Sequence, residues 1–232
     1  MKTLGLYIAA ALTLTACATS MNTGITSNNG SQTVTEFPVE TALLNIYTKA
    51  RADTLIPAND NQNTVLEIKV VPKGSMIFNN HQVQSAETTY TIKSDGIIDQ
   101  QLISVNYYTL NPVKFYGFTD SLGLYSIAEQ TADMPKMAAI GASSELITEN
   151  VYNSSEQDVL VDSYTQSWSL SRASTDTAWF CISTLANPVT RDPHSKNSDC
   201  HLINAQGDLL SGKFMDTYLS DSGIKKIIYN SQ

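Results

Sequence analysis

Residues 163–171 read Ser-Tyr-Thr-Gln-Ser-Trp-Ser-Leu-Ser, and they give the clearest indication of the fold class. Large side chains occupy every second position, and serine or threonine fills the positions between them. A period of two is the repeat of a β-strand, whose successive side chains point to opposite faces of a sheet. The stretch therefore predicts a strand with Trp168 and Leu170 on a buried face and a solvated Ser/Thr face opposite.

The same alternation recurs along most of the chain. From about residue 64, Leu66, Ile68 and Val70 alternate with charged residues. Short strands and Gly-containing turns follow one another closely, with few helical crossovers between them, which favours an antiparallel meander over parallel βαβ units. The further candidate strands are residues 88–93, 102–108, 113–118, 122–128, 178–184 and 224–229.

One segment has the period of a helix instead. Pro38 suits the first turn of a helix, and Pro57 ends the segment. The apolar residues that recur three and four positions apart are Val39, Ala42, Leu43, Ile46, Tyr47 and Ala50. Residues 129–148 predict a long loop or a single helical turn. The expected fold is mainly β (α+β): one N-terminal amphipathic helix over residues 38–52, then an antiparallel meander forming a curved sheet, a half-barrel or a sandwich.

The N-terminus resembles the signal of a bacterial lipoprotein. Lys2 precedes an apolar run at residues 4–14, which has the length of a signal-peptide core and falls far below the ~20 residues that span hydrocarbon. Leu-Thr-Ala-Cys at residues 14–17 then resembles the lipobox of that family. The resemblance implies that Cys17 begins the mature chain and carries a diacylglycerol thioether and an N-acyl chain such as palmitate.

The resemblance also implies a location in the cell envelope. Ala18, and not aspartate, follows the cysteine, which in that family implies the outer membrane of a Gram-negative cell, with the domain facing the periplasm. The chain is then divided into a signal peptide at residues 1–16, a lipidated cysteine with a polar flexible tether at residues 17–34, and a single β-rich domain at residues 35–232.

The charge of the chain excludes one class of partner. The formal net charge is −8 at pH 7. Nucleic-acid binding needs a basic surface, and docking on anionic lipid needs basic residues as well. We therefore expect no nucleic-acid partner and attachment to the membrane through the lipid on Cys17. The sequence has no phosphate-binding Gly-rich loop, CxxC pair or dinucleotide fingerprint, so no cofactor is expected.

With Cys17 assigned to the lipid, Cys181 and Cys200 remain as a pair. A disulfide is the default in an oxidising compartment. It would close a polar loop over residues 182–199 that contains two prolines. Such a link restricts the unfolded chain and contributes about 3 kcal/mol to stability. We expect a structural staple that holds this loop.

Four residues near that disulfide have side chains that bind metals: Asp192, His194, Asp199 and His201. Imidazole and carboxylate groups are zinc ligands. The two histidines, however, lie seven positions apart in a Pro-containing loop that presets no geometry. A solvated loop beside the disulfide explains the pattern more simply, and no metal is expected.

No catalytic constellation stands out in the sequence. Ser222 and Lys225 fit S-x-x-K but lack its companion motifs. Residues 141–145 resemble half of a nucleophile elbow, with glutamate where the second glycine belongs. His81 lies in a polar run and has no visible serine partner. No catalytic residue is assigned.

Two pairs of carboxylates have the residue type for acid–base catalysis. They are Asp158 with Asp162 and Glu145 with Glu149. Such work needs two carboxyl groups to converge across a cleft, which sequence spacing does not establish. Charges on a solvated face explain both pairs more simply.

Three functions stay open. The first is a non-catalytic envelope lipoprotein whose β-rich domain binds a protein or glycan partner. The second is a carrier of lipid or another apolar ligand, by analogy with the element order of half-barrel envelope carriers, and it predicts a large apolar cavity between the helix and the sheet. The third is a cell-wall-directed hydrolase, which predicts converging carboxylates or a Ser–His pair in a cleft.

Overall fold

The computed structural model describes residues 33–58, 63–186, 196–220 and 223–231. The expected signal peptide, Cys17 and the tether up to residue 32 lie outside the described residues. In the described part of the chain, no helix has both the length and the apolar character needed to cross a membrane.

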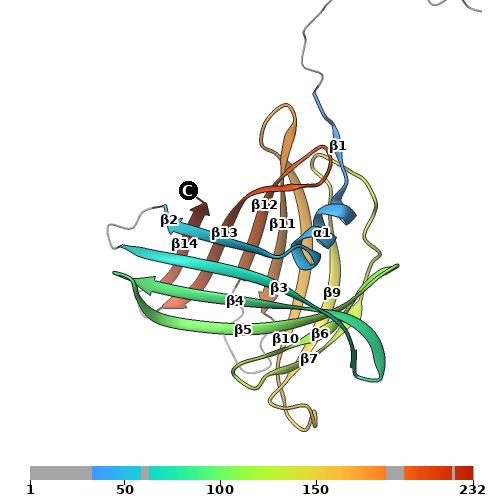
Figure 1. Ribbon diagram of the computed structural model, residues 1–232, viewed down its shortest axis with the longest axis vertical. Helices are drawn as coiled ribbons and strands as arrows, with labels where there is room; N and C mark the ends of the chain where they lie inside the picture. The colour runs from blue at the N-terminus through green and yellow to red at the C-terminus, as the bar shows by residue number, and fades with distance from the viewer. Residues whose placement is uncertain (1–32, 59–62, 187–195, 221–222, 232) are drawn as a thin grey trace, which may run out of the picture. The chain divides into compact units, whose positions relative to one another are not determined.

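The described residues contain one helix, α1 (Val39–Thr48), which precedes a series of long strands (Figure 1). Two very short strands, β1 (Glu36–Phe37) and β8 (Ala138–Ala139), pair with each other. The remaining strands are β2 (Arg51–Pro57), β3 (Thr64–Phe78), β4 (His81–Ser94), β5 (Ile97–Leu110), β6 (Val113–Asp120), β7 (Tyr125–Gln130), β9 (Ser143–Tyr152), β10 (Leu160–Arg172), β11 (Thr177–Ala186), β12 (Lys196–Asn204), β13 (Leu209–Ser220) and β14 (Gly223–Ser231).

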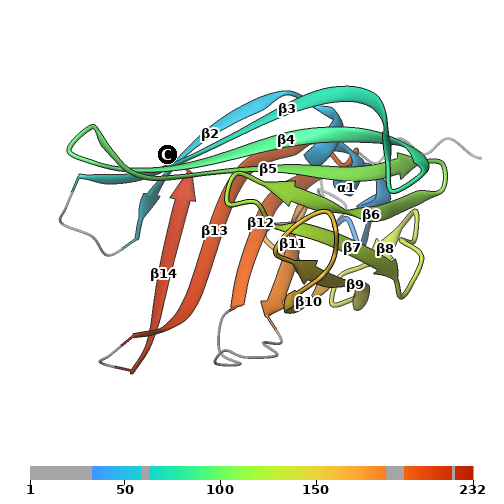
Figure 2. The same cartoon turned by 90° about the horizontal axis from the view of Figure 1, so that it is seen from below.

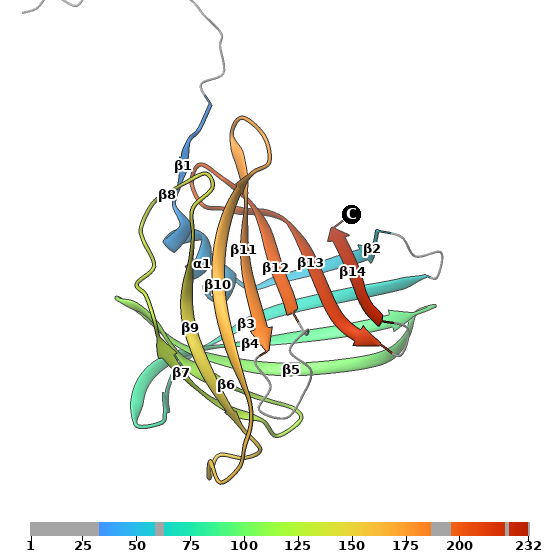
Figure 3. The same cartoon turned by 180° about the vertical axis from the view of Figure 1, so that it is seen from behind.

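These twelve remaining strands form a closed antiparallel barrel (Figures 2 and 3). Each strand pairs with the next one along the chain, and β14 pairs with β2 to close the ring. Closure leaves the sheet without a free edge, since every strand has two neighbours. The predicted mainly β fold with one helix and an antiparallel meander is confirmed. Among the three forms that the sequence left open, the curved sheet closes completely.

Strand β10 shows the two faces that its sequence predicts. Trp168 and Leu170 are buried in the main core, while Ser167 and Ser169 point to the outside of the barrel. Pairing places Trp168 opposite Ile182 of β11, so the same side of the neighbouring strand also faces inward. Alternation along the chain therefore becomes an inside and an outside of the barrel.

Helix α1 packs inside one end of the barrel and plugs it. Its buried side chains belong to one core cluster with residues from strands all around the ring. Tyr47, at the end of the helix, contacts the rings of Tyr108 and Phe115, with centroids 5.5 and 5.2 Å away. The strand residues in this cluster are Val70, Ala86, Tyr108, Val113, Phe115, Leu146, Ile147, Trp168, Leu170, Ala178, Phe180, Ile182 and Ile203.

The helix is shorter than the expected 38–52, because the chain turns into β2 directly after it. Lys49 is already extended, and Arg51 begins the strand. The guanidinium of Arg51 donates to the carbonyl of Ile46, 3.3 Å away, and so satisfies a carbonyl at the end of the helix. Ala50 fits the helical period but lies outside the helix, exposed to solvent.

The meander also contains strands that the sequence did not indicate. Residues 129–148 include the end of β7 and the start of β9, and not a helical turn. A register shift at Leu146, between two regular pairings with β10, interrupts the alternation of β9. The sequence does not indicate β12 for another reason: its inward face carries Asn197, Asp199 and His201. A strand whose inward residues are polar lacks the apolar alternation from which a strand is predicted.

Replacing Leu43 by alanine is expected to destabilise the barrel strongly. Leu43 is 1 % exposed and lies in the cluster between α1 and the barrel wall. Removal of a buried leucine side chain leaves a cavity and costs about 2–5 kcal/mol. Urea unfolding followed by circular dichroism measures the loss, and Thr41→Ala on the exposed side of α1 is the control. Equal small losses in both variants would contradict the plug.

Candidate ligand-binding cavity

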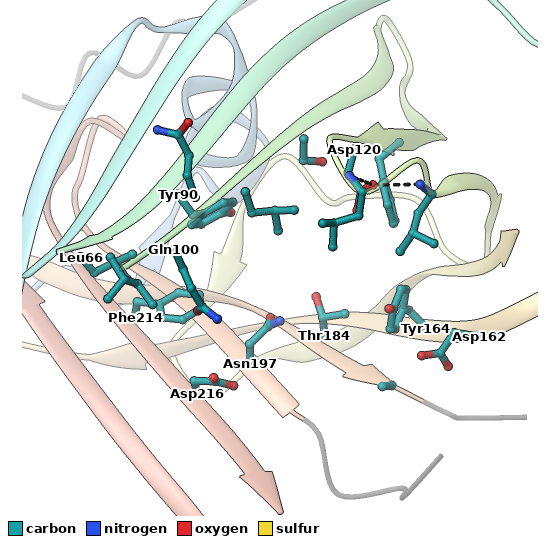
Figure 4. A pocket seen from close by; sticks show the side chains of 18 of the residues that line it. Leu66, Tyr90, Gln100, Asp120, Asp162, Tyr164, Thr184, Asn197, Phe214 and Asp216 are labelled. Atoms are coloured by element: carbon teal, nitrogen blue, oxygen red, sulfur yellow. Dashed lines mark hydrogen bonds between the residues drawn. The ribbon is translucent and has the colours of Figure 1, made fainter. Parts of the chain in front are cut away.

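The barrel contains a cavity of about 900 Å³ at the end away from α1 (Figure 4). A single strand can contribute residues both to the core at the plugged end of the barrel and to the cavity at the other end. In β11, Ala178 and Phe180 belong to the core around the helix, whereas Thr184 and Ala186 line the cavity. A volume of this size is typical of small-molecule sites. The helix thus fills one end of the barrel interior, and the other end contains the cavity.

Aromatic side chains form two opposite parts of the cavity wall. Figure 4 shows Tyr90 and Phe214 on one side and Tyr164 on the other. The ring centroids of Tyr90 and Phe214 lie 6.2 Å apart, and Tyr229 continues the group at 6.4 Å from Phe214. On the side of the cavity opposite Tyr90 and Phe214, Phe118 and Tyr164 form a second pair, with ring centroids 6.5 Å apart. The apolar residues that complete the lining are Leu66, Ile92, Leu102, Leu122, Leu124 and Ala186.

Three aspartates also line the cavity, and neighbouring backbone amides hold the carboxylates of two of them. Asp120 accepts hydrogen bonds from the amides of Leu122 and Leu124, both 2.9 Å long, which fix the β6–β7 turn. Asp162 accepts from the amide of Ser163 at 2.7 Å. Partial burial raises the pKa of Asp216. These carboxylates face the space where a ligand would lie.

Glu149 is a buried acid in the same wall. Its carboxyl oxygens accept from Gln166 at 3.1 Å and, more weakly, from Ser126 at 3.4 Å. Burial raises the pKa of Glu149 to about 7, although both hydrogen bonds oppose the shift. Because this value lies at neutral pH, Glu149 can hold or release a proton under physiological conditions.

A cluster of charged residues lies between the cavity and the plug. Arg51 Nε lies 3.0 Å from Asp53 Oδ2, and Arg51 Nη2 lies 3.9 Å from Asp199 Oδ2. A second cavity of about 120 Å³ is lined by Tyr47, Arg51, Tyr90 and Asp199 among others. Burial alone would raise the pKa of Asp199, but the neighbouring His201 and Arg51 outweigh it and hold the pKa below its ordinary value.

The four metal-ligand candidates are only partly described. Asp192 and His194 lie outside the described residues. Asp199 and His201 face the barrel interior, with His201 Nε2 3.3 Å from Asp199 Oδ2 but not aligned for a hydrogen bond. Within the described ranges, no group of three or more histidine, cysteine, aspartate or glutamate side chains could hold a metal ion.

The structure brings no catalytic motif together at the cavity. Ser222 lies outside the described residues, and Lys225 is exposed on β14. Glu145, which ends the half elbow, is exposed at the start of β9. The ring of His81 contacts Tyr116, with centroids 4.8 Å apart, in the exposed β3–β4 hairpin.

Each carboxylate pair that the sequence suggested is split. Glu145 is exposed on the outside of the barrel, while Glu149 is 4 % exposed and lines the cavity. Asp158 is exposed, while Asp162 lines the cavity. The simpler interpretation of solvated charges therefore holds for Glu145 and Asp158 and is wrong for Glu149.

Cys181 and Cys200 form a disulfide, as expected, although its setting differs from the expected one. The two cysteines lie directly opposite each other on β11 and β12, which pair continuously from Thr177–Asn204 to Leu185–Lys196. Residues 182–186 and 196–199 of the expected loop are therefore strand, held by the pairing of β11 with β12, and residues 187–195 lie outside the described residues. The disulfide reinforces one strand pair on the outer face of the barrel.

The chain was compared with protein-family models, with curated proteins and with solved structures, and no match was found. The cavity geometry therefore carries the functional argument alone.

The free energy of unfolding is expected to fall between pH 5 and pH 8 because of Glu149. Its pKa is 4.5 ordinarily and about 7 when folded. Over this range the folded protein keeps a proton that the unfolded chain releases, so a rise in pH favours unfolding, by about 3 kcal/mol. Glu149→Gln removes this loss, whereas exposed Glu145→Gln keeps it. Urea unfolding at both pH values tests this, and parallel profiles for the two variants would refute the assignment.

Two thiols are expected to appear only after reduction. Maleimide labelling of the denatured full chain, followed by mass spectrometry, is expected to modify neither Cys181 nor Cys200 before a reductant is added. The double variant Cys181→Ser, Cys200→Ser is expected to lose about 2–4 kcal/mol of stability. It should keep its β-type circular dichroism spectrum because the β11–β12 hydrogen bonds remain. Labelling without reductant would disprove the disulfide.

Proposed function

We propose that this protein is a binding protein of the cell envelope, which holds an amphipathic small molecule inside its barrel and is anchored to the outer membrane through lipid on Cys17. The observation that carries the proposal is the cavity of about 900 Å³ at the end of the barrel opposite α1. Its lining combines apolar and aromatic side chains with a few carboxyl groups, which is the composition of a ligand site.

The cavity favours a carrier over a protein-binding module, which the sequence placed first. The carrier interpretation predicted a cavity between the helix and the sheet. That space is instead occupied by the core around α1 apart from the cavity of about 120 Å³, and the large cavity lies at the other end. A filled interior throughout would have opposed a carrier, but the cavity here approaches the upper end of the volumes found for small-molecule sites.

The first described residues of the chain lie at the plugged end of the barrel. The amide of Val34 donates to the carbonyl of Thr175 at 2.8 Å, in the hairpin between β10 and β11. This hairpin lies at the end plugged by α1, since the core residues Leu170 and Ala178 flank it. The chain from Cys17 therefore joins the barrel at the plugged end, and the cavity lies at the opposite end.

A neutral fluorescent amphiphile, N-phenyl-1-naphthylamine, is expected to bind the full chain carrying Cys17→Ser, which cannot be lipidated. Thr184→Trp places an indole ring in the cavity between its aromatic walls and should weaken saturable binding. Leu185→Trp is the matched control, because Leu185 is the next residue of β11 and points outward, where it is exposed. Fluorescence titration measures both. Absence of saturable binding, or equal binding by both variants, would refute the proposed function.

A further inference from the structure

Three strands present the same pair of residues to the cavity. β6 contributes Phe118 and Asp120, β10 contributes Tyr164 and Asp162, and β13 contributes Phe214 and Asp216. In each pair an aromatic residue and an aspartate are two positions apart, so both side chains point inward and their backbones lie about 7 Å apart along the strand. β6 and β10 lie three strands apart in the ring, with the rings of Phe118 and Tyr164 6.5 Å apart, and β13 lies three strands beyond β10.

The aspartate always lies nearer the open end. β6 and β13 run away from the plugged end, since Val113 and Leu209 at their starts contact the core around α1, and their aspartates follow their aromatics. β10 runs the other way, since Leu170 near its end is in that core, and Asp162 precedes Tyr164. The cavity therefore has a deeper aromatic layer and an outer layer of carboxylates.

The carboxylates of this outer layer have no cation beside them in the described structure. Among the described residues that line the cavity there is no lysine, arginine or histidine. Among the ion pairs of the described residues, none includes Asp120, Asp162 or Asp216. Arg51, the cation deeper in the barrel, is paired with Asp53 and Asp199. The described residues that line the site therefore offer negative charge and aromatic faces, and none of them is basic.

We infer that the ligand carries a positively charged head group: its apolar part lies between the aromatic walls and its cation lies among the three aspartates. This inference rests on the proposed function, because it names the ligand class for the same cavity. Aromatic rings attract cations through their faces, and carboxylates form charge-assisted contacts with ammonium groups. A carboxylate or phosphate ligand would instead meet like charges.

The aromatic pairs contact the apolar part of the ligand, and the aspartates contact its head group. Phe214 with Tyr90, and Phe118 with Tyr164, supply apolar surface that any hydrocarbon chain can contact. The aspartates are already fixed by local backbone hydrogen bonds at Asp120 and Asp162, so their positions do not depend on a ligand. Preorganised charge of one sign discriminates between ligands of the same chain length and different head groups.

A series of ten-carbon amphiphiles tests the inference by displacement of N-phenyl-1-naphthylamine from the Cys17→Ser full chain at pH 7. Decyltrimethylammonium is a cation, 1-decanol is neutral and decanoate is an anion. The cation is expected to bind about tenfold more tightly than the alcohol, and the anion more weakly than the alcohol. Equal affinities for the three, or tighter binding of the anion, would overturn the inference and leave the proposed function standing.

Variants of the outer layer give a second measurement. Asp216→Asn and Asp162→Asn are each expected to lower the ratio of cation affinity to alcohol affinity about threefold. Asp158→Asn, an exposed position just before β10, should keep the wild-type ratio. Two substitutions on different strands guard against one that fails to fold. An unchanged ratio in both would overturn the inference. Failure of every probe, N-phenyl-1-naphthylamine included, would instead refute the proposed function together with it.

Discussion

A closed ring of twelve strands is wider than its own inward side chains can fill, and the packing of α1 inside one end answers this constraint. Val39, Leu43 and Ile46 supply the apolar volume that the wall residues alone lack at that end. At the other end no element takes this place in the described structure, and the interior stays hollow. Both the core around α1 and the cavity at the other end therefore result from the width of the twelve-strand barrel.

The polar residues of the interior follow from the same division. Arg51, Asp53 and Asp199 lie where the apolar plug gives way to the cavity, and they compensate one another. Charges of this kind are tolerated in a barrel only when they are paired or reach solvent. Glu149 takes part in no ion pair of the described residues, and its burial raises its pKa to about 7. From the plugged end to the open end, the interior therefore passes from the apolar core around α1 to the ion pairs of Arg51, and then to the cavity lined by aspartates.

Much of this fold is visible in the sequence where one face of a strand is apolar. The alternation around Trp168 and around Ile68 predicts strands that exist, and the apolar stripe of Leu43 and Ile46 predicts the helix. The sequence does not indicate β12 and β13, because inward polar residues such as Asn197 and Asp216 face the cavity and not a core. Closure is also invisible, since it depends on pairing between β14 and β2, which lie at opposite ends of the domain sequence. The aromatic–aspartate pairs could have been found by examining the residues two positions from each aromatic on every strand.

The seam between β14 and β2 has a consequence for how the molecule comes into being. Three residue pairs join these strands, from Tyr229–Pro57 to Ser231–Leu55, and one partner belongs to the last nine residues before the final glutamine. The ring therefore cannot close until the chain from β2 through β14 is accessible. Until then, β2 and β13 each present an unpaired edge, and such edges invite pairing with other chains. Pairing of β14 with both neighbours removes these two edges at once.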